Sequence, residues 1–147
     1  MDEIERLLVL LEDEGNDNIL KYTNTSIKRQ KNQILQELGL PREKLKNIHE
    51  KLQQYRYVLD LADIRYGSYI RWIPLKNPQR VYLTTGGIVL DIKILDCIHI
   101  VCKNNRNQLF QIKFDEVLIF QKISDQEQLV LNILDFIKKH NIDLHKS

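Results

Sequence analysis

Apolar residues recur with a helical period in four stretches of this chain and with a strand period in its middle. The helical stretches are residues 2–14, 25–38, 42–55 and 124–140. In the first of them, aliphatic residues at i, i+3, i+4 and i+7 form one face: Ile4, Leu7, Leu8 and Leu11. This spacing is typical of an amphipathic α-helix. Residues 67–122 contain no such segment, so the pattern predicts helices on both sides of a β-rich centre.

Helix-stop residues separate the second and third helical stretches. Gly39 follows the last apolar residue of the second stretch, and Pro41 comes two positions later. Glycine ends helices in a left-handed conformation, and proline suits the first turn of the next helix. We therefore expect a helix hairpin over residues 25–56, joined by Leu-Gly-Leu-Pro. Residues 57–66 are interpreted as a connector to the β-rich centre.

The β-rich centre consists of short alternating runs that turn residues separate. The predicted strands are Tyr69–Ile73, Arg80–Leu83, Ile88–Ile94, Cys97–Lys103, Leu109–Phe114 and Val117–Gln121. Gly86-Gly87 indicates a positive φ angle or a close backbone approach, and Asp115-Glu116 indicates a tight acidic turn. Five to six strands in about 55 residues is the size of a small closed barrel of the SH3-like kind.

The fourth helical stretch opens with a capping signature. Ser124 is followed three residues later by Glu127, the pattern of a capping box. We expect this C-terminal helix to pack on the barrel. The predicted fold class is α+β, with N-terminal helices, a small SH3-like β-barrel and a C-terminal helix in one structural domain. Its segments are an acidic N-terminal helix (1–18), a basic helix hairpin and connector (19–66), the barrel (67–122) and the C-terminal helix (123–147).

Charge is distributed unevenly along the chain, although the net charge of the 147 residues is only +2. Residues 1–20 contain seven acids and one base, whereas residues 21–56 contain nine bases and three acids. The two segments could dock on each other, the basic one could meet an acidic partner, or both could be solvated helical faces. The small total charge does not by itself indicate nucleic-acid binding.

Six residues of the β-rich centre form the candidate binding surface. They are basic or aromatic residues from predicted strands and loops: Tyr69, Arg71, Trp72, Arg80, Lys103 and Arg106. Arg71 and Trp72 are adjacent on one strand, so they face opposite sides of the sheet. Trp72 is interpreted either as a core residue or as an aromatic binding platform.

The sequence contains no recognisable catalytic or metal-binding constellation. Its four histidines and two cysteines lack zinc spacing, and no serine has the context of a nucleophile elbow. Cys97 and Cys102 are interpreted as small apolar strand residues in a reducing compartment. We predict a protein that is not an enzyme and has no cofactor, metal or small-molecule substrate. No apolar run approaches the roughly 18–20 residues that a membrane helix needs, and the acidic start is unlike a signal peptide.

Several motifs in residues 30–140 carry a resemblance to a protein family. They are Gly67 with the run Tyr69–Ile73, the pair Gly86-Gly87, and Phe120-Gln121-Lys122. In these motifs the chain resembles a family of small, poorly characterised proteins encoded by nucleocytoplasmic large DNA viruses, the giant viruses. The resemblance implies a viral or virus-derived gene whose product is in the host cytoplasm or the virion. It supplies no catalytic residues.

The favoured function is a non-enzymatic binding or assembly module that acts through protein–protein contacts. The acidic first helix, through Ile4, Leu7, Leu8 and Leu11, is the candidate partner-binding arm. The alternative is a nucleic-acid-binding module that uses the basic hairpin and the barrel loops. It is supported by the polar and basic loop Lys103–Asn107, which is suited to phosphate contacts.

Overall fold

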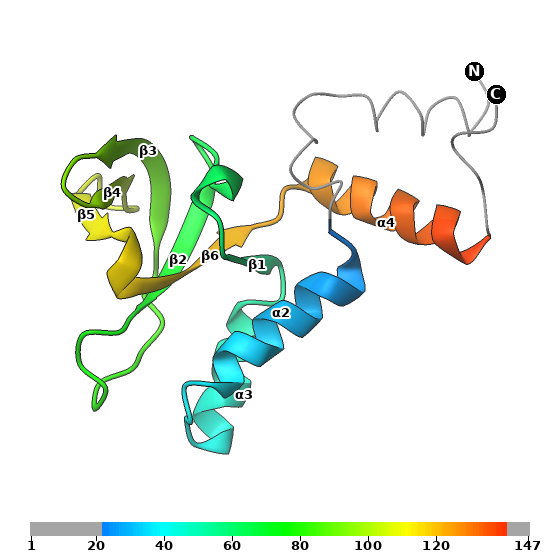
Figure 1. Cartoon of the computed structure of the whole chain (residues 1–147), viewed down its shortest axis with the longest axis horizontal. Coiled ribbons are helices and arrows are strands. Elements are labelled where there is room, and N and C mark those ends of the chain that lie inside the picture. Colours follow the sequence, from blue (N-terminus) through cyan, green and yellow to red (C-terminus); the bar gives the residue numbers. More distant parts are fainter. Residues whose placement is uncertain (1–21, 141–147) are drawn as a thin grey trace. The chain divides into compact units, whose positions relative to one another are not determined.

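A computed structural model of the chain describes residues 22–140 (Figure 1). The described chain divides into two compact units, residues 22–30 with 123–140 and residues 31–122. Helix α2 (Asn24–Gln36) begins in the first unit and ends in the second. The expected helix over 2–14 lies outside the described residues, and so does its candidate partner-binding face of Ile4, Leu7, Leu8 and Leu11.

The first unit is built on helix α4 (Asp125–Lys139). The predicted capping box is confirmed: the Glu127 N–H donates to Ser124 Oγ, and the Ser124 N–H donates to Glu127 Oε1, both at 3.1 Å. Val130 and Leu131 of α4 are fully buried in a cluster with Tyr22 and Ile27. These contacts bury the apolar stripe of α4 within its own unit. Its packing on the β-strands stays a prediction.

The second unit contains a six-stranded antiparallel sheet. Its strands are β1 (Tyr55–Val58), β2 (Tyr69–Pro74), β3 (Gly87–Ile94), β4 (Ile98–Lys103), β5 (Leu109–Lys113) and β6 (Val117–Lys122). They lie in the order β1-β6-β2-β3-β4-β5. The α+β class is therefore confirmed. The closed barrel is not confirmed, because the sheet is open and has β1 and β5 as its two edges.

Two sequence-based assignments in this unit are wrong. Residues 80–83 form no ladder with another strand; Val81 is buried against the helices, so its apolar character serves packing and not pairing. The second error concerns helix α3 (Arg42–Lys51), whose apolar pattern predicts a continuation to Tyr55. Instead, Tyr55–Val58 is strand β1, and it pairs with Ile119–Lys122 of β6.

Buried side chains lie on both faces of the sheet. On one face, Ile70, Trp72, Val89, Ile100 and Ile119 form a cluster between the strands. On the other face, Phe120 and Leu118 of β6 and Ile73 of β2 pack against Leu35 of α2 and Ile48 of α3. The two helices are joined by the predicted turn, in which Gly39 has φ +62° and Pro41 is the N-cap of α3. The hairpin thus covers the β1-β6-β2 half of the sheet (Figure 1).

Candidate functional site

The aromatic and basic residues on β2 mainly serve the fold. The Tyr69 hydroxyl donates to the Thr85 carbonyl, and Arg71 Nε donates to the Thr84 carbonyl at 2.8 Å. The Thr84 N–H in turn donates to the Trp72 carbonyl at 2.9 Å. Residues 84–86 are thereby held against β2. We call this arrangement the β2 clasp: Tyr69, Arg71 and the segment 84–86.

Gly86 allows this close approach. Its φ is +87°, and a Cβ at this position would overlap the Ile70 carbonyl oxygen. A Cβ on the neighbouring Gly87 would lie 2.8 Å from the Lys103 carbonyl oxygen. The predicted close backbone approach is therefore found at both glycines: Gly86 lies against the backbone of β2, and Gly87 lies against the end of β4.

Trp72, Arg80, Lys103 and Arg106 are not brought together with the β2 clasp into one surface. Trp72 faces the opposite side from Arg71 and is only 7% exposed, within the buried cluster. Arg80 lies over the Tyr82 ring, 5.2 Å from its centroid. Lys103 ends β4, and Arg106 lies exposed in the loop that leads to β5. Lys103 and Arg106 are therefore separate from the β2 clasp, at one end of the β4–β5 hairpin.

A side chain shapes the β4–β5 loop. Asn104 Oδ1 accepts hydrogen bonds from the Arg106 N–H at 3.0 Å and the Gln108 N–H at 2.9 Å. The Asn104 N–H donates to the Gln108 carbonyl at 3.0 Å, and Asn107 adopts a positive φ of 60°. These bonds set the loop conformation and leave the Arg106 side chain exposed at its turn.

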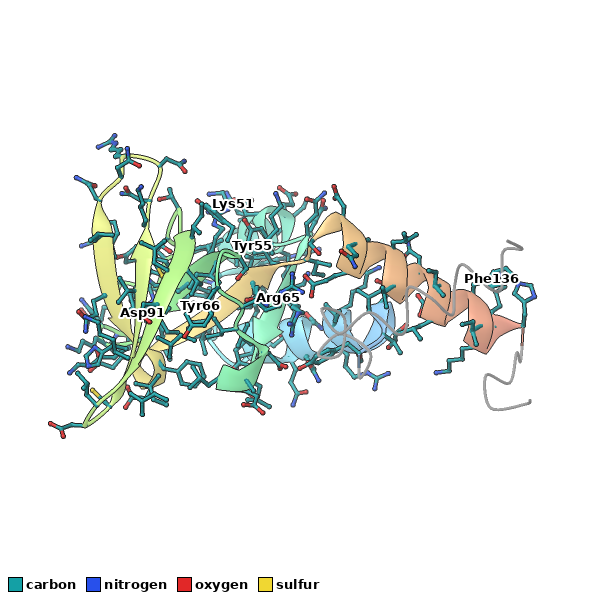
Figure 2. The ribbon with its side chains drawn as sticks, turned by 90° about the horizontal axis from the view of Figure 1, so that it is seen from above. Lys51, Tyr55, Arg65, Tyr66, Asp91 and Phe136 are labelled. Atoms are coloured by element: carbon teal, nitrogen blue, oxygen red, sulfur yellow. The ribbon has the colours of Figure 1, made fainter. Side chains whose placement is uncertain are left out.

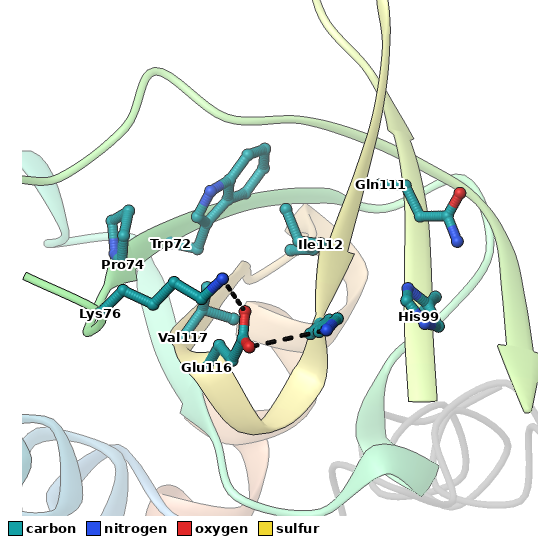
Figure 3. Close-up of a pocket in the computed structure, with 9 residues that line it drawn as sticks. Trp72, Pro74, Lys76, His99, Gln111, Ile112, Glu116 and Val117 are labelled. Atoms are coloured by element: carbon teal, nitrogen blue, oxygen red, sulfur yellow. Dashed lines mark ion pairs between the residues drawn. The ribbon is translucent and has the colours of Figure 1, made fainter. Parts of the chain in front are cut away.

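A pocket of about 390 Å³ lies where the ends of several strands meet (Figure 3). Its lining comes from the end of β2 and the residues after it, from β4 and β5, and from the 3₁₀ helix η3 (Phe114–Glu116) and the strand that follows: Trp72, Pro74, Lys76, His99, Gln111, Ile112, Lys113, Glu116 and Val117. Trp72 contributes to both the core cluster and the pocket. The core interpretation of Trp72 is therefore confirmed, and its role as an aromatic binding platform stays a prediction.

The charged residues of the pocket form a short ion-pair chain. Glu116 lies between two lysines, with Oε2 3.5 Å from Lys76 Nζ and Oε1 3.8 Å from Lys113 Nζ (Figure 3). These side chains are partly or largely exposed, so the pairs contribute little to stability. One carboxylate against two ammonium groups leaves the charged rim with a net positive charge.

His99 adds a polar group to the pocket wall. Its Nε2 lies 3.0 Å from Cys97 Sγ. Its Nδ1 is buried and has no hydrogen-bond partner among residues 22–140. Both cysteines are free thiols, and burial raises the pKa of the Cys102 thiol to about 12. Cys102 is therefore an inert core residue, as interpreted from the sequence.

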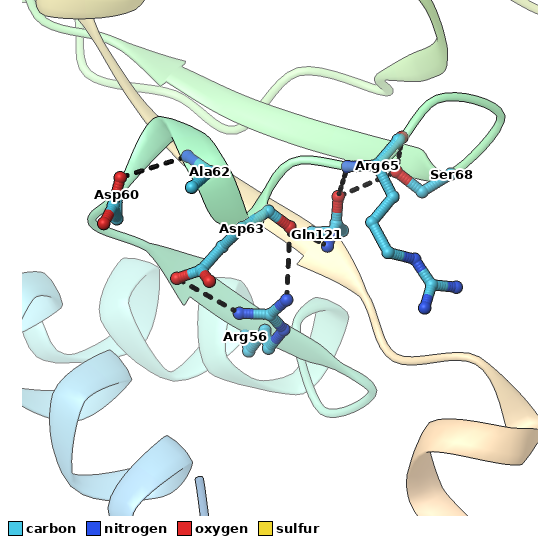
Figure 4. Close-up of polar contacts among 7 residues, drawn as sticks. All are labelled: Arg56, Asp60, Ala62, Asp63, Arg65, Ser68 and Gln121. Carbon is cyan, nitrogen blue, oxygen red and sulfur yellow. Dashed lines mark hydrogen bonds and ion pairs between the residues drawn. The ribbon is translucent and has the colours of Figure 1, made fainter. Parts of the chain in front are cut away.

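A buried polar network lies near the β1 edge of the sheet (Figure 4). Arg56 of β1 and Asp63 of the 3₁₀ helix η2 (Leu61–Asp63) are 1% and 0% exposed and lie 3.8 Å apart. Gln121 Nε2 donates to the Asp63 carbonyl at 2.9 Å, while its Oε1 accepts from the Arg65 N–H at 3.0 Å and the Ser68 hydroxyl at 2.8 Å. The network ties β1, η2 and β6 together and gives Gln121 a structural role.

The basic helix hairpin is less available for a ligand than the charge count suggests. Lys31 is buried, and its Nζ donates to the carbonyls of Leu52 at 2.8 Å and Tyr55 at 3.0 Å. Arg56 is held in the buried network. A smaller cavity of about 260 Å³ lies where α3 leads into β1, and its lining includes Lys51 and Tyr55 (Figure 2). It is lined by mixed polar side chains, which do not point to one ligand.

Sequence reasoning identified Trp72 but missed most of the pocket. Pro74, Lys76, Ile112 and Glu116 come from separate segments and share no local pattern. The available signal was the tight acidic turn at Asp115-Glu116, which is η3 and supplies the pocket carboxylate. Its contacts with two lysines depend on the strand pairing.

Within residues 22–140, no three His, Cys, Asp or Glu side chains gather in a way that could bind a metal ion. The helices described for this range are too short or too polar to cross a membrane. Comparisons of the chain with protein-family models, with curated proteins and with solved structures found no match.

Proposed function

We propose that this protein is a non-catalytic binding module that recognises a segment of another protein at the pocket beside β5. The observation that carries this proposal is the pocket itself. It combines apolar walls from Trp72, Ile112 and Val117 with two exposed lysines, Lys76 and Lys113. A volume of about 390 Å³ is near the lower end of the range for ligand pockets. It suits one or two side chains better than a large cofactor.

The connectivity of the sheet supports the finer fold assignment. Strands β2 to β5 follow one another in the sheet, and β6 returns to pair with β2 after the 3₁₀ helix η3. This order, with a 3₁₀ helix before the last strand, resembles the connectivity of SH3-like barrels, and we propose that the strand region is an SH3-like fold with an open sheet. Small barrels of this kind mostly bind other molecules through their loops and strand ends. This argument is an analogy of fold and does not identify a partner.

The viral setting belongs to the same proposal. If the family resemblance holds, the partner is a component of a virion or of a viral complex in the host cytoplasm. An assembly contact of this kind needs a recognition surface and no catalytic group.

The test is a selection of random 12-residue peptides displayed on phage, with the full chain as target. We expect enriched peptides to share a motif and to lose binding to the variants Ile112→Glu and Lys76→Glu. Lys76 has a side chain 74% exposed, so its substitution leaves the fold intact. The matched control is Ile94→Glu, because Ile94 is 72% exposed on β3 and does not line the pocket. Selected peptides that bind the wild type, Ile94→Glu, Ile112→Glu and Lys76→Glu equally well would contradict the proposal.

Nucleic-acid binding remains a second candidate because of one observation. Residues 31–122 contain fifteen Lys and Arg against nine Asp and Glu, a net charge of +6. Phosphate contacts would make the affinity for labelled DNA or RNA fall steeply between about 50 and 200 mM salt. The charge reversals Lys103→Glu and Arg106→Glu should then abolish binding. Arg71 is unsuitable for this test, because it holds the Thr84 carbonyl.

A further inference from the structure

The edge of the sheet formed by β5 has no pairing partner among residues 22–140. In the described chain this strand, Leu109–Lys113, pairs only with β4. The first pair joins His99 to Lys113, and the last joins Lys103 to Leu109. The Asn104 N–H donates to the Gln108 carbonyl, so hydrogen-bonded pairs recur at Cys102–Phe110 and Ile100–Ile112. The backbone groups of Leu109, Gln111 and Lys113 therefore point away from β4, toward the free edge.

The two faces of β5 differ in chemistry. Phe110 and Ile112 pair with Cys102 and Ile100, which lie in the buried cluster. Leu109, Gln111 and Lys113 face the other way, and their neighbours on β4 are Lys103, Val101 and His99. A strand added along this edge would place alternate side chains beside an apolar face and a polar, cationic face.

Basic side chains predominate in the two strands and the loop that form this edge, and the acidic residues Asp115 and Glu116 follow them. Residues 97–114 contain Lys103, Arg106 and Lys113 and no Asp or Glu. Lys113 lies on the edge strand itself and Arg106 in the loop before it, whereas Lys103 lies on β4, behind Leu109. Lys113 Nζ is also 3.8 Å from Glu116 Oε1, so an acidic side chain of an added strand would share this cation with Glu116. Opposite charges on cross-strand neighbours are stabilising, and like charges are destabilising.

Solvated edge strands are normally protected against pairing. Charged side chains, especially lysine, are one such protection, and Lys113 could serve this purpose. However, Leu109 is 67% exposed and Phe110 is 42% exposed on a five-residue strand. Exposed apolar residues invite pairing, and they favour a binding role for this edge over a purely protective one.

We propose that β5 receives an extended segment of a partner protein as an added strand, in which apolar residues alternate with Asp or Glu. This inference rests on the proposed function, because β5 and the pocket share Gln111, Ile112 and Lys113. The apolar residues of the partner segment lie beside Phe110 and Ile112 and reach toward the pocket. Its acidic residues lie on the face of Lys113, and its backbone bonds to Leu109, Gln111 and Lys113.

The probe is a labelled eight-residue peptide in which Ile or Val alternates with Glu, with both ends capped. Its matched control carries Lys in place of every Glu. Fluorescence anisotropy with the full chain should show at least tenfold tighter binding of the acidic peptide. No binding of either peptide, or equal binding of both, would overturn the inference.

A backbone scan separates strand addition from simple occupation of the pocket. Single N-methyl groups are placed on successive residues of the acidic peptide. Because alternate N–H groups of an added strand face β5, we expect tenfold weaker binding at every second position and little change between them. Uniform tolerance of N-methylation overturns strand addition. It leaves the proposed function standing if the phage-selected peptides still require Ile112 and Lys76.

Gln111→Pro tests the contribution of β5, because it removes the Gln111 N–H that the proposal places in a hydrogen bond with the peptide. Proline is accepted on an edge strand where the N–H faces away from the sheet, so the ladder with β4 is kept. The melting temperature should change little, while the acidic peptide binds at least tenfold more weakly. Sedimentation of the wild type over a concentration range completes the test. Dimers that Gln111→Pro dissociates would show that a second copy occupies the edge, and they would overturn the proposed partner class.

Discussion

The two edge strands of the sheet, β1 and β5, are built in opposite ways. On β1, Arg56 is buried beside Asp63, and the helix hairpin packs over the adjacent β6. On β5, four of five residues are exposed, and β4 is the only strand that pairs with it in the described chain. On β1, the Tyr55 N–H donates to the Leu52 carbonyl and the Tyr55 carbonyl accepts from Lys31 Nζ, so its own unit supplies partners at this edge. The two edges thus differ in the elements that surround them, and this difference supports β5 as the proposed binding edge.

The buried ion pair of β1 should give the largest effect. Asp63→Ala leaves the Arg56 guanidinium buried without its carboxylate, and we expect the free energy of unfolding to fall by about 3–5 kcal/mol. The matched change on the other edge, Leu109→Asn, should alter it by no more than about 0.5 kcal/mol. Urea denaturation of both variants measures this contrast. Comparable losses would show that the two edges are equally important for the fold.

The β2 clasp depends on the absence of a side chain at Gly86. Gly86→Ala combines a positive φ with overlap of the Ile70 carbonyl, and we expect a loss of about 3 kcal/mol or more. Gly39→Ala is the control, because Gly39 has φ +62° but no heavy atom within 4 Å of the place that a Cβ would take. Its cost should be only the backbone term of about 1–2 kcal/mol. The difference between the urea midpoints of the two variants measures the cost of the overlap with the Ile70 carbonyl. Equal midpoints would show that this overlap adds no destabilisation.

A comparison of two arginines tests which basic residues are free to bind. Arg71→Ala removes a charged donor to the Thr84 carbonyl and should cost about 1–2 kcal/mol of stability. Arg106→Ala, at an exposed loop position, should change stability by no more than about 0.5 kcal/mol. Thermal and urea unfolding report both values. If Arg71→Ala were as stable as wild type, Arg71 would again be a candidate for ligand contact.

The smallest expected effect is a pH dependence of stability that arises from His49 on α3, one of the helices that pack on β6 and β2. Burial, followed by the nearby charge of Lys31, lowers the pKa of His49 on α3 below its usual 6.5. The folded state therefore binds this proton less readily than the unfolded chain. Stability contributed by neutral His49 is fully present above pH 6.5 and declines as the pH falls below it. His49→Gln should reduce this decline in unfolding experiments at about pH 7 and pH 5. If the stability of His49→Gln fell with pH as steeply as that of the wild type, the decline would come from other titrating groups.

The pocket shows why part of the site escaped sequence reasoning. Trp72 stands out as the single tryptophan, but its neighbours Pro74, Ile112 and Glu116 are ordinary residues in separate segments. Tyr69 and Arg71 are residue types that favour ligand contacts. Their hydrogen-bond acceptors, the carbonyls of Thr85 and Thr84, lie more than ten residues away in the chain. No local pattern shows whether such a donor is already satisfied.

The sequence alone determined the features that depend on neighbouring residues. The capping box at Ser124, the turn at Gly39 and Pro41, and five of the six strands to within about two residues follow from local sterics and hydrogen bonding. Only the tertiary structure decided that Tyr55–Val58 is a strand, that residues 80–83 are not, and that β5 is an edge. Strand pairing joins distant residues, and its free energy depends on which surfaces the helices bury. The availability of β5 for a partner is for the same reason a property of the fold.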